Sequence, residues 1–172
     1  MKKKYVALTI LLSIILIVII SGSYFIALNV VSDAVVYRIG FSSRSGSVSI
    51  EPTKTTLSGI FILENRADIP LAFDVNIKVF VYPVENQPFN GNLEFLSGPG
   101  FDDMQFIGNV SAKNAQAPPH GQAEVPGSFD IVPEDALNVI RNGNFTVLWV
   151  TYEIEVTGSF IGWSITKVPA FQ

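Results

Sequence analysis

The sequence predicts a mainly β domain with one short helix, preceded by one N-terminal transmembrane α-helix. Three observations lead to this prediction. A charge-free apolar stretch lies near the N-terminus, apolar and polar residues alternate with period two further along, and Gly, Pro and Asn interrupt the chain at close intervals. The chain has 172 residues, which is enough for one ordinary domain beside the helix.

The composition excludes several classes of protein. Hydrophobic residues make up 48% of the chain and charged residues 15%, which is the opposite of a disordered protein. Cysteine is absent, so disulfides, cysteine metal sites, thiol catalysis and lipid attachment through cysteine are excluded. A single histidine excludes a metal site with several histidines. We therefore predict no cofactor and no metal site.

The first element is the apolar stretch. Three lysines, Lys2 to Lys4, precede a run of 28 residues from Tyr5 to Ser32 that carries no charge. As a helix this run would be about 42 Å long, against a hydrocarbon core of about 30 Å. It has no polar face, so we predict a transmembrane helix to about Asn29 with a short helical extension outside. Residues 1–32 form the basic tip and anchor, and residues 33–172 form the second domain.

The flanking charges predict the orientation of this anchor. Lysines precede the span and Asp33 follows it, and positive flanks stay on the cytoplasmic side. The domain is therefore expected outside the cell membrane. Without the three N-terminal lysines the chain carries 8 basic and 15 acidic residues, a net charge of −7. This balance argues against a nucleic-acid partner and against binding to anionic headgroups.

Two alternatives to a retained anchor are a cleaved signal peptide and a pilin-type leader. Ser21, Gly22 and Ser23 resemble a small-residue cleavage site. The apolar run resumes at residues 24–28, however, and cleavage would leave it at the mature N-terminus. A pilin-type leader needs a small residue before the cut, and Lys4–Tyr5 does not provide one.

In the first half of the domain, Gly, Ser and Pro separate short apolar segments. We expect an apolar start, a turn, two strands, a break and a long strand (residues 35–41, 42–47, 48–56, 59–64, 65–70 and 73–82). The long strand alternates strictly. One face carries Phe73, Val75, Ile77, Val79 and Val81, and the other begins with Asp74, Asn76 and Lys78. Such a strand is half buried.

In the second half, we expect a loop over residues 83–100 with a short edge strand at Leu93–Leu96. A turn at residues 118–121 leads into a strand over residues 124–131, bulged at Gly127. A short helix follows, with Pro133 at its first position and Gly143 beyond its end. Two last strands cover residues 145–156 and 160–168. Alternation over residues 151–157 places Tyr152, Ile154 and Val156 on one face.

This order of elements resembles the water-stress and hypersensitive-response (WHy) domain of desiccation-related, late-embryogenesis-abundant proteins. The resemblance covers residues 48–169. The matching residues are Asn65, Ile69, Pro70, Leu71, Val125 and Pro126. Arg66 and Ala67 replace the Pro and Asn of the Asn-Pro-Asn tripeptide of that family. The resemblance implies an immunoglobulin-like antiparallel β-sandwich of about seven strands with one helix. It implies no catalytic residues.

Acidic and histidine side chains provide three candidate sites. His120, in the Pro-Gly turn, is either a base or lone metal ligand or, as we favour, an exposed turn residue, because no motif supplies a nucleophile. A Ca²⁺ loop of Asp102, Asp103 and Glu94 lacks ligands, and a solvated acidic turn is favoured. Glu153 and Glu155 lie on one strand face about 7 Å apart. A carboxylate pair can hydrolyse glycosides, but a charged outer face is favoured.

Two sequons and two tryptophans complete the candidates. Asn109 and Asn144 begin Asn-X-Ser/Thr sequons, and both lie in the part expected outside. Trp149 is expected in the core and Trp163 partly exposed, although stacking on a sugar is an alternative.

The expected function is non-enzymatic. We expect an envelope stress or interaction module, or an accessory subunit of a membrane complex, with the lipid bilayer and membrane proteins as partners. One alternative is a cell-surface filament subunit assembled by strand donation, with residues 35–41 as the donor. Another is an extracellular hydrolase.

Overall fold

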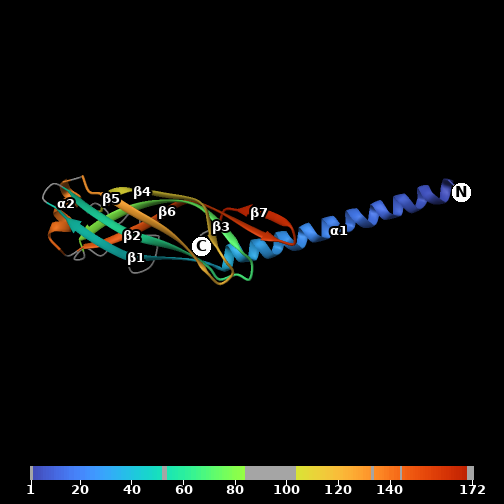
Figure 1. The fold of residues 1–172 in the computed structure, drawn as a ribbon, viewed down its shortest axis with the longest axis horizontal. Helices are drawn as coiled ribbons and strands as arrows, with labels where there is room; N and C mark the ends of the chain where they lie inside the picture. The colour runs from blue at the N-terminus through green and yellow to red at the C-terminus, as the bar shows by residue number, and fades with distance from the viewer. Residues whose placement is uncertain (1, 52–53, 84–103, 133, 144, 170–172) are drawn as a thin grey trace.

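The computed structural model describes the chain except for residues 1, 52–53, 84–103, 133, 144 and 170–172. A long helix leads into a β-domain that contains one short second helix (Figure 1). In chain order, the elements are α1 (Lys2–Tyr37), β1 (Ile39–Ile50), β2 (Thr55–Asn65), β3 (Leu71–Pro83), β4 (Gln105–Ala117), β5 (Gln122–Asp130), α2 (Glu134–Arg141), β6 (Phe145–Phe160) and β7 (Trp163–Lys167).

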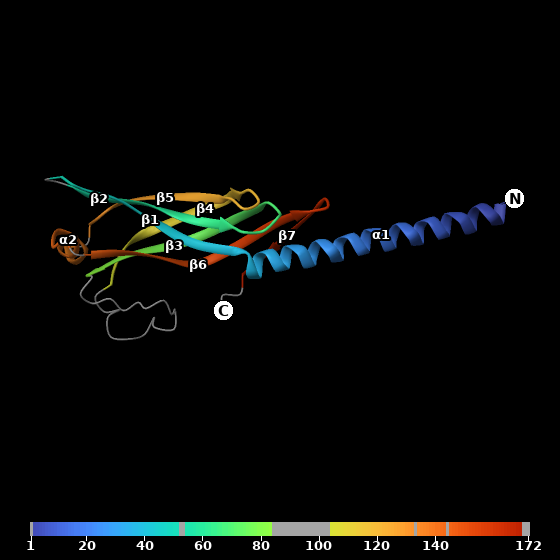
Figure 2. The ribbon, with the colours of Figure 1, turned by 90° about the horizontal axis from the view of Figure 1, so that it is seen from below.

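The strands form two antiparallel sheets stacked as two layers (Figure 2). One sheet has the order β1-β2-β5 and the other the order β4-β3-β6-β7. The turn between β4 and β5 passes from one layer to the other. The structure therefore confirms a mainly β domain with one short helix behind a long N-terminal apolar helix.

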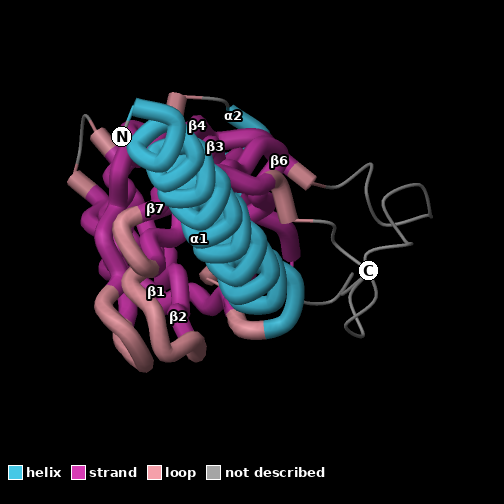
Figure 3. Tube along the Cα trace, turned by 90° about the vertical axis from the view of Figure 1, so that its right-hand side faces the viewer, coloured by secondary structure: helices cyan, strands magenta, loops and turns pink. Residues whose placement is uncertain are grey.

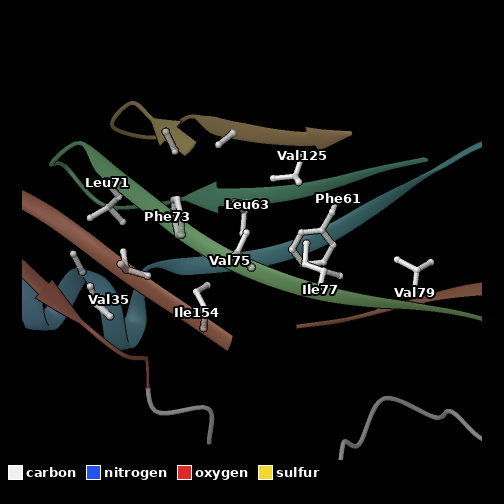
Figure 4. Close-up of a cluster of buried hydrophobic side chains, with 14 of the residues drawn as sticks. Val35, Phe61, Leu63, Leu71, Phe73, Val75, Ile77, Val79, Val125 and Ile154 are labelled. Carbon is white, nitrogen blue, oxygen red and sulfur yellow. The ribbon is translucent and has the colours of Figure 1, made fainter. Parts of the chain in front are cut away.

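The core lies between the two layers and is centred on β3. Its odd-numbered residues from Leu71 to Val81 are buried and face the β2 side chains Phe61 and Leu63 (Figure 4). On the opposite face of β3, Asp74 and Lys78 are exposed. The predicted phase of this strand is confirmed. It follows directly from the period of two, since one face of an antiparallel sheet packs on the core.

The first β-hairpin differs from the prediction. α1 continues to Tyr37, so the expected β start over residues 35–41 is helical in its first part. β1 then runs through the expected turn at residues 42–47, with a register shift between Ser45 and Val48. The Ser/Gly sequence suggests a turn, but β2 pairs with residues 39–45 and 48–50, and tertiary pairing overrides the local preference.

Two further consequences follow for this hairpin. The predicted strand over residues 48–56 is interrupted, because Glu51 and Lys54 exchange backbone hydrogen bonds and close the β1–β2 hairpin. The segment over residues 39–41 pairs with residues 63–65 of the same chain. Within the single chain, the predicted donor segment is therefore part helix and part paired strand.

The second half also differs at two positions. Gly127 is not bulged: β5 pairs with β2 in unbroken register, with Gly127 opposite Gly59. A bulge lies in β6, where Asn76 pairs with Glu153 and Ile77 with Thr151, so Tyr152 is the extra residue. Tyr152 is therefore exposed, with the Lys78 ammonium 5.0 Å from its ring centroid, and the prediction that it shares a face with the buried Ile154 and Val156 is wrong. The expected edge strand at residues 93–96 lies outside the described residues.

Candidate functional site

The N-terminal half of α1 is an apolar cylinder. From Tyr5 to Gly22 the chain carries no charge, and its large apolar residues are exposed in every direction around the helix. These residues are Tyr5, Val6, Leu8, Ile10, Leu11, Leu12, Ile14, Ile15, Leu16, Ile17, Val18, Ile19 and Ile20. A helix that is apolar on all sides is stable only inside a larger apolar body or a membrane. α1 is long and apolar enough to cross a membrane.

The C-terminal half of α1 belongs to the β-domain. Ala27, Val31, Ala34 and Val35 are almost fully buried and lie on one face of the helix. This part of α1 packs against β6 and β7, and Figure 3 shows the helix lying across the end of the domain with β7 and β1 beside it. Gly158 permits this approach, because a Cβ built there would lie 2.9 Å from Val31 Cγ1. The apolar N-terminal half of α1 and the β-domain are therefore joined by one continuous helix without a linker between them.

The hairpin formed by β6 and β7 extends along α1 (Figure 2). The Trp163 indole Nε1 donates a hydrogen bond to Ser23 Oγ at 3.1 Å. The Tyr24 and Trp163 rings meet edge to face, with centroids 5.1 Å apart. Trp163 is half-buried, as predicted, and its side chain contacts α1.

A cleft of about 280 Å³ opens between the two sheets beside Trp149. Trp149 reaches across to the glycine pair of β2 and β5: a Cβ on Gly59 would lie 2.6 Å from its ring and one on Gly127 2.9 Å from it. Phe61 stacks on Trp149 and Phe129 meets it edge to face. The cleft is lined by Ser43, Val48, Leu57, Ser58, Gly59, Phe145, Thr146, Val147 and Trp149, none of which is ionisable. It offers hydroxyl groups and an apolar wall, but no acid or base.

A polar corner lies where β2 ends, next to the turn between β4 and β5. Asn65 is buried there, and its Nδ2 donates to the carbonyl oxygens of Ile69, Ala117 and Pro118 at 2.8, 3.0 and 3.0 Å. Its Oδ1 accepts a hydrogen bond from the Ala67 amide at 2.9 Å. Asn65, one of the residues on which the resemblance depends, thus connects three segments through its hydrogen bonds.

The charged groups of this corner are surface pairs. His120 is exposed at positive φ, and its Nε2 lies 2.7 Å from Asp68 Oδ1. No sequence pattern indicated this carboxylate partner. Arg66 donates to Glu64 Oε2 at 2.6 Å, and this hydrogen bond, with help from the guanidinium charge and Ser42, lowers the pKa of Glu64. The shallow pocket here is lined by Glu64, Asn65, Arg66, His120, Gly121 and Gln122, none of which carries a hydroxyl or thiol nucleophile.

The other predicted residues do not meet at one place. Glu153 and Glu155 are both exposed on the outer face of β6, and Glu153 Oε2 accepts a hydrogen bond from Asn76 at 2.6 Å. Asn109 is exposed on β4 opposite Lys78. Asn144, Glu94, Asp102 and Asp103 lie outside the described residues. Within the described part of the chain, no three acidic or histidine side chains are grouped to hold a metal ion.

The buried half of α1 is the functional feature that the sequence prediction missed. Its contacts lie at positions i, i+4, i+7 and i+8, starting at Ala27, which is the spacing of a helix packed on one face. This pattern is present in the sequence, but it is obscured by the apolar run that precedes it.

Comparisons with known proteins assign no family. No family model matches the chain, and no curated protein matches it. Among solved structures, a β-glucosidase involved in saponin metabolism from intestinal bacteria has 10% identity and a TM-score of 0.31, covering 78% of this chain and 16% of its own. The β-glucosidase DesR from Streptomyces venezuelae, in complex with D-glucose, has 8% identity and a TM-score of 0.28, covering 75% and 15%. A structural-genomics target has 10% identity and a TM-score of 0.28, covering 77% and 81%.

This chain therefore spans about one sixth of the length of either glucosidase. Similarity at this level assigns neither a fold family nor an activity.

Proposed function

We propose that this protein is a single-pass membrane protein whose N-terminus is cytoplasmic and whose β-sandwich lies outside. The sandwich acts without catalysis, as an envelope stress or interaction module or as an accessory subunit of a membrane complex. The supporting observation is the exposed half of α1. From Tyr5 to Gly22 it would be about 27 Å long, close to the thickness of the hydrocarbon core of about 30 Å. Lys2 to Lys4 at one end favour the cytoplasmic side for that end.

A non-catalytic role is supported by where the reactive side chains lie. The only histidine, His120, and the carboxylate pair Glu153 and Glu155 are on separate exposed surfaces, and the Trp149 cleft is lined by neutral groups. General acid–base catalysis needs such groups within hydrogen-bond reach of one substrate position. We also propose that the domain is an immunoglobulin-like sandwich of the WHy family. This part of the proposal is supported by the order of the elements and by the hydrogen bonds of Asn65.

The anchor is tested by extraction and protease protection of the full chain in cells. We expect the protein to stay with membranes through an alkaline wash and to require detergent for release. Protease added to intact cells should remove a tag placed after Gln172. Release by the alkaline wash, or digestion only after the membrane is broken, would contradict the anchor or its orientation respectively.

The role is tested by purification from detergent-solubilised membranes. Co-purification of integral membrane proteins at fixed stoichiometry supports the accessory-subunit role. Fibres in electron micrographs of the untreated cell surface that contain this chain would instead favour the filament alternative.

A further inference from the structure

We propose that the tip of the β6–β7 hairpin, residues 160–163, lies in the headgroup layer of the outer membrane leaflet beside α1. The domain would then contact the bilayer through two elements, the helix that crosses it and a hairpin that is seated on it. This inference rests on the proposed membrane anchor and adds a lipid-binding surface to it.

The level of the hairpin follows from its contacts with α1. Gly158 lies against Val31, and Trp163 binds Ser23, eight residues closer to the N-terminus of the helix. The hairpin therefore runs along α1 toward the membrane-spanning half. If Tyr5 to Gly22 fills the hydrocarbon core, Ser23 is at the outer interface. The turn residues Ile161 and Gly162 lie between the paired residues Phe160 and Trp163 and form the tip of the hairpin, next to the contact with Ser23.

The chemistry of the hairpin fits a lipid interface. From Val156 to Thr166 the chain carries no charge. Trp163 and Tyr24 form an aromatic pair at the end of the span, where Trp and Tyr are enriched in membrane proteins. Phe25 and Ile161 are exposed beside this pair, at 65% and 57%. Apolar side chains that would face water in a soluble protein would here contact acyl chains and headgroups.

The conformation of the turn is a second, independent observation. Ile161 and Gly162 both have positive φ, +48° and +78°, which defines a two-residue hairpin turn of the type that favours Asn-Gly. A β-branched residue at positive φ is strained and uncommon. Ile161 is exposed and strained and is not part of the core of the domain, whereas an apolar contact with lipid would favour an isoleucine here.

The polar corner of the domain carries charged groups, unlike this hairpin. Arg66 donates its backbone amide to the Arg38 carbonyl, so the polar corner lies at the C-terminal end of α1. Arg38 is 15 residues beyond Ser23, about 22 Å farther from the membrane along the helix. The corner carries Arg66, Asp68 and His120 on its surface. Charged groups therefore lie away from the expected interface, and the neutral tip lies at it.

The test uses the full chain, which has no native cysteine, with one cysteine introduced at a time. Ile161→Cys probes the tip. Val132→Cys is the matched control, because Val132 is also β-branched and is 79% exposed at the far end of the domain. Leu12→Cys probes the span. Each variant is labelled with an environment-sensitive fluorophore and reconstituted in phosphatidylcholine vesicles that contain lipid spin-labelled either near the headgroup or deep in the acyl chain.

We expect the label at position 161 to lose fluorescence with the shallow quencher, the label at 12 with the deep quencher, and the label at 132 with neither. If position 12 is quenched while 161 behaves like 132, the anchor stands and the seated hairpin is wrong. If neither 12 nor 161 is quenched, the proposed anchor itself fails, and the hairpin proposal with it.

Discussion

The two halves of α1 are both mainly apolar but lie in opposite environments. Tyr5 to Gly22 exposes apolar side chains on all sides, whereas Ser23 to Tyr37 buries one face against β6 and β7. Both halves are apolar, and no charge separates them before Asp33. The difference arises from what each half meets, which is the solvent or membrane in one case and Gly158 and its neighbours in the other. Hydrophobicity identifies a segment that must be buried but does not identify its partner.

The largest test of this comparison is a pair of truncations. A chain that begins at Ser23 keeps every buried contact of α1, and a chain that begins at Asp33 loses Ala27 and Val31 from the core. Four small to medium side chains on the face of α1 beyond Ser23 lose their burial or their helical support in the shorter chain. This loss should lower the free energy of unfolding by about 5 kcal/mol. Whole domains are stable by about 5–15 kcal/mol.

We therefore expect the chain from Ser23 to melt cooperatively in denaturant and the chain from Asp33 to be unfolded or close to it. Equal stability of the two truncated chains would show that the helix packing contributes nothing.

A substitution in β3 measures burial inside the sandwich for comparison with the helix. Ile77→Ala should destabilise the full chain in detergent by about 2–5 kcal/mol, because it removes a fully buried side chain and leaves a cavity. Asn76→Ala, its neighbour, loses only an exposed hydrogen bond to Glu153 and should cost about 0.5 kcal/mol. Denaturant unfolding followed by tryptophan fluorescence measures both. A larger effect of Asn76→Ala would invert the strand phase.

A matched pair of valines separates the two halves of the helix directly. Val31→Ala should cost about 2 kcal/mol of unfolding free energy, since Val31 is fully buried against the hairpin. Val18→Ala makes the same chemical change in the exposed half and should leave the melting of the domain unchanged. The same detergent-based denaturant titration applies. Equal effects at the two positions would remove the distinction on which the anchor is based.

The smallest expected effect is a dependence of stability on pH. It should affect the β-domain and not the apolar N-terminal half of α1. Arg66 lowers the pKa of Glu64 in the folded state, so the pair stabilises the domain above the usual glutamate pKa of 4.5 and loses this contribution as pH falls through the lower folded value. Arg66→Gln should lower stability slightly at neutral pH and flatten the decline in melting temperature below about pH 4.5.

Membrane retention should not change over this pH range, because the stretch from Tyr5 to Ser32 contains no Asp, Glu or His. An unaltered acid decline in the Arg66→Gln variant would contradict the role of the pair.

The elements that the sequence predicted correctly are those in which a strong periodic signal agrees with the final packing. The burial of β3 alternates from Leu71 to Val81, and its buried face is the predicted one. α2 begins with Glu134 and Asp135 and ends before Gly143 at positive φ, as its end signals indicate. Where local signals were weak or pointed elsewhere, the prediction was wrong. The Ser/Gly segment of β1 and the extra residue at Tyr152 are examples, because the pairing partner decides both.

The sequence by itself determined that the chain has an apolar helix able to span a membrane, a mainly β domain and the phase of its central strand. These properties depend on composition and local period, which neighbouring residues define. Only the tertiary structure decided that Ser23 to Tyr37 is part of the domain, that Trp149 lies over Gly59 and Gly127, and that Trp163 binds the helix. Each of these depends on residues far apart in the chain whose shapes fit only after folding, and no local pattern encodes that fit.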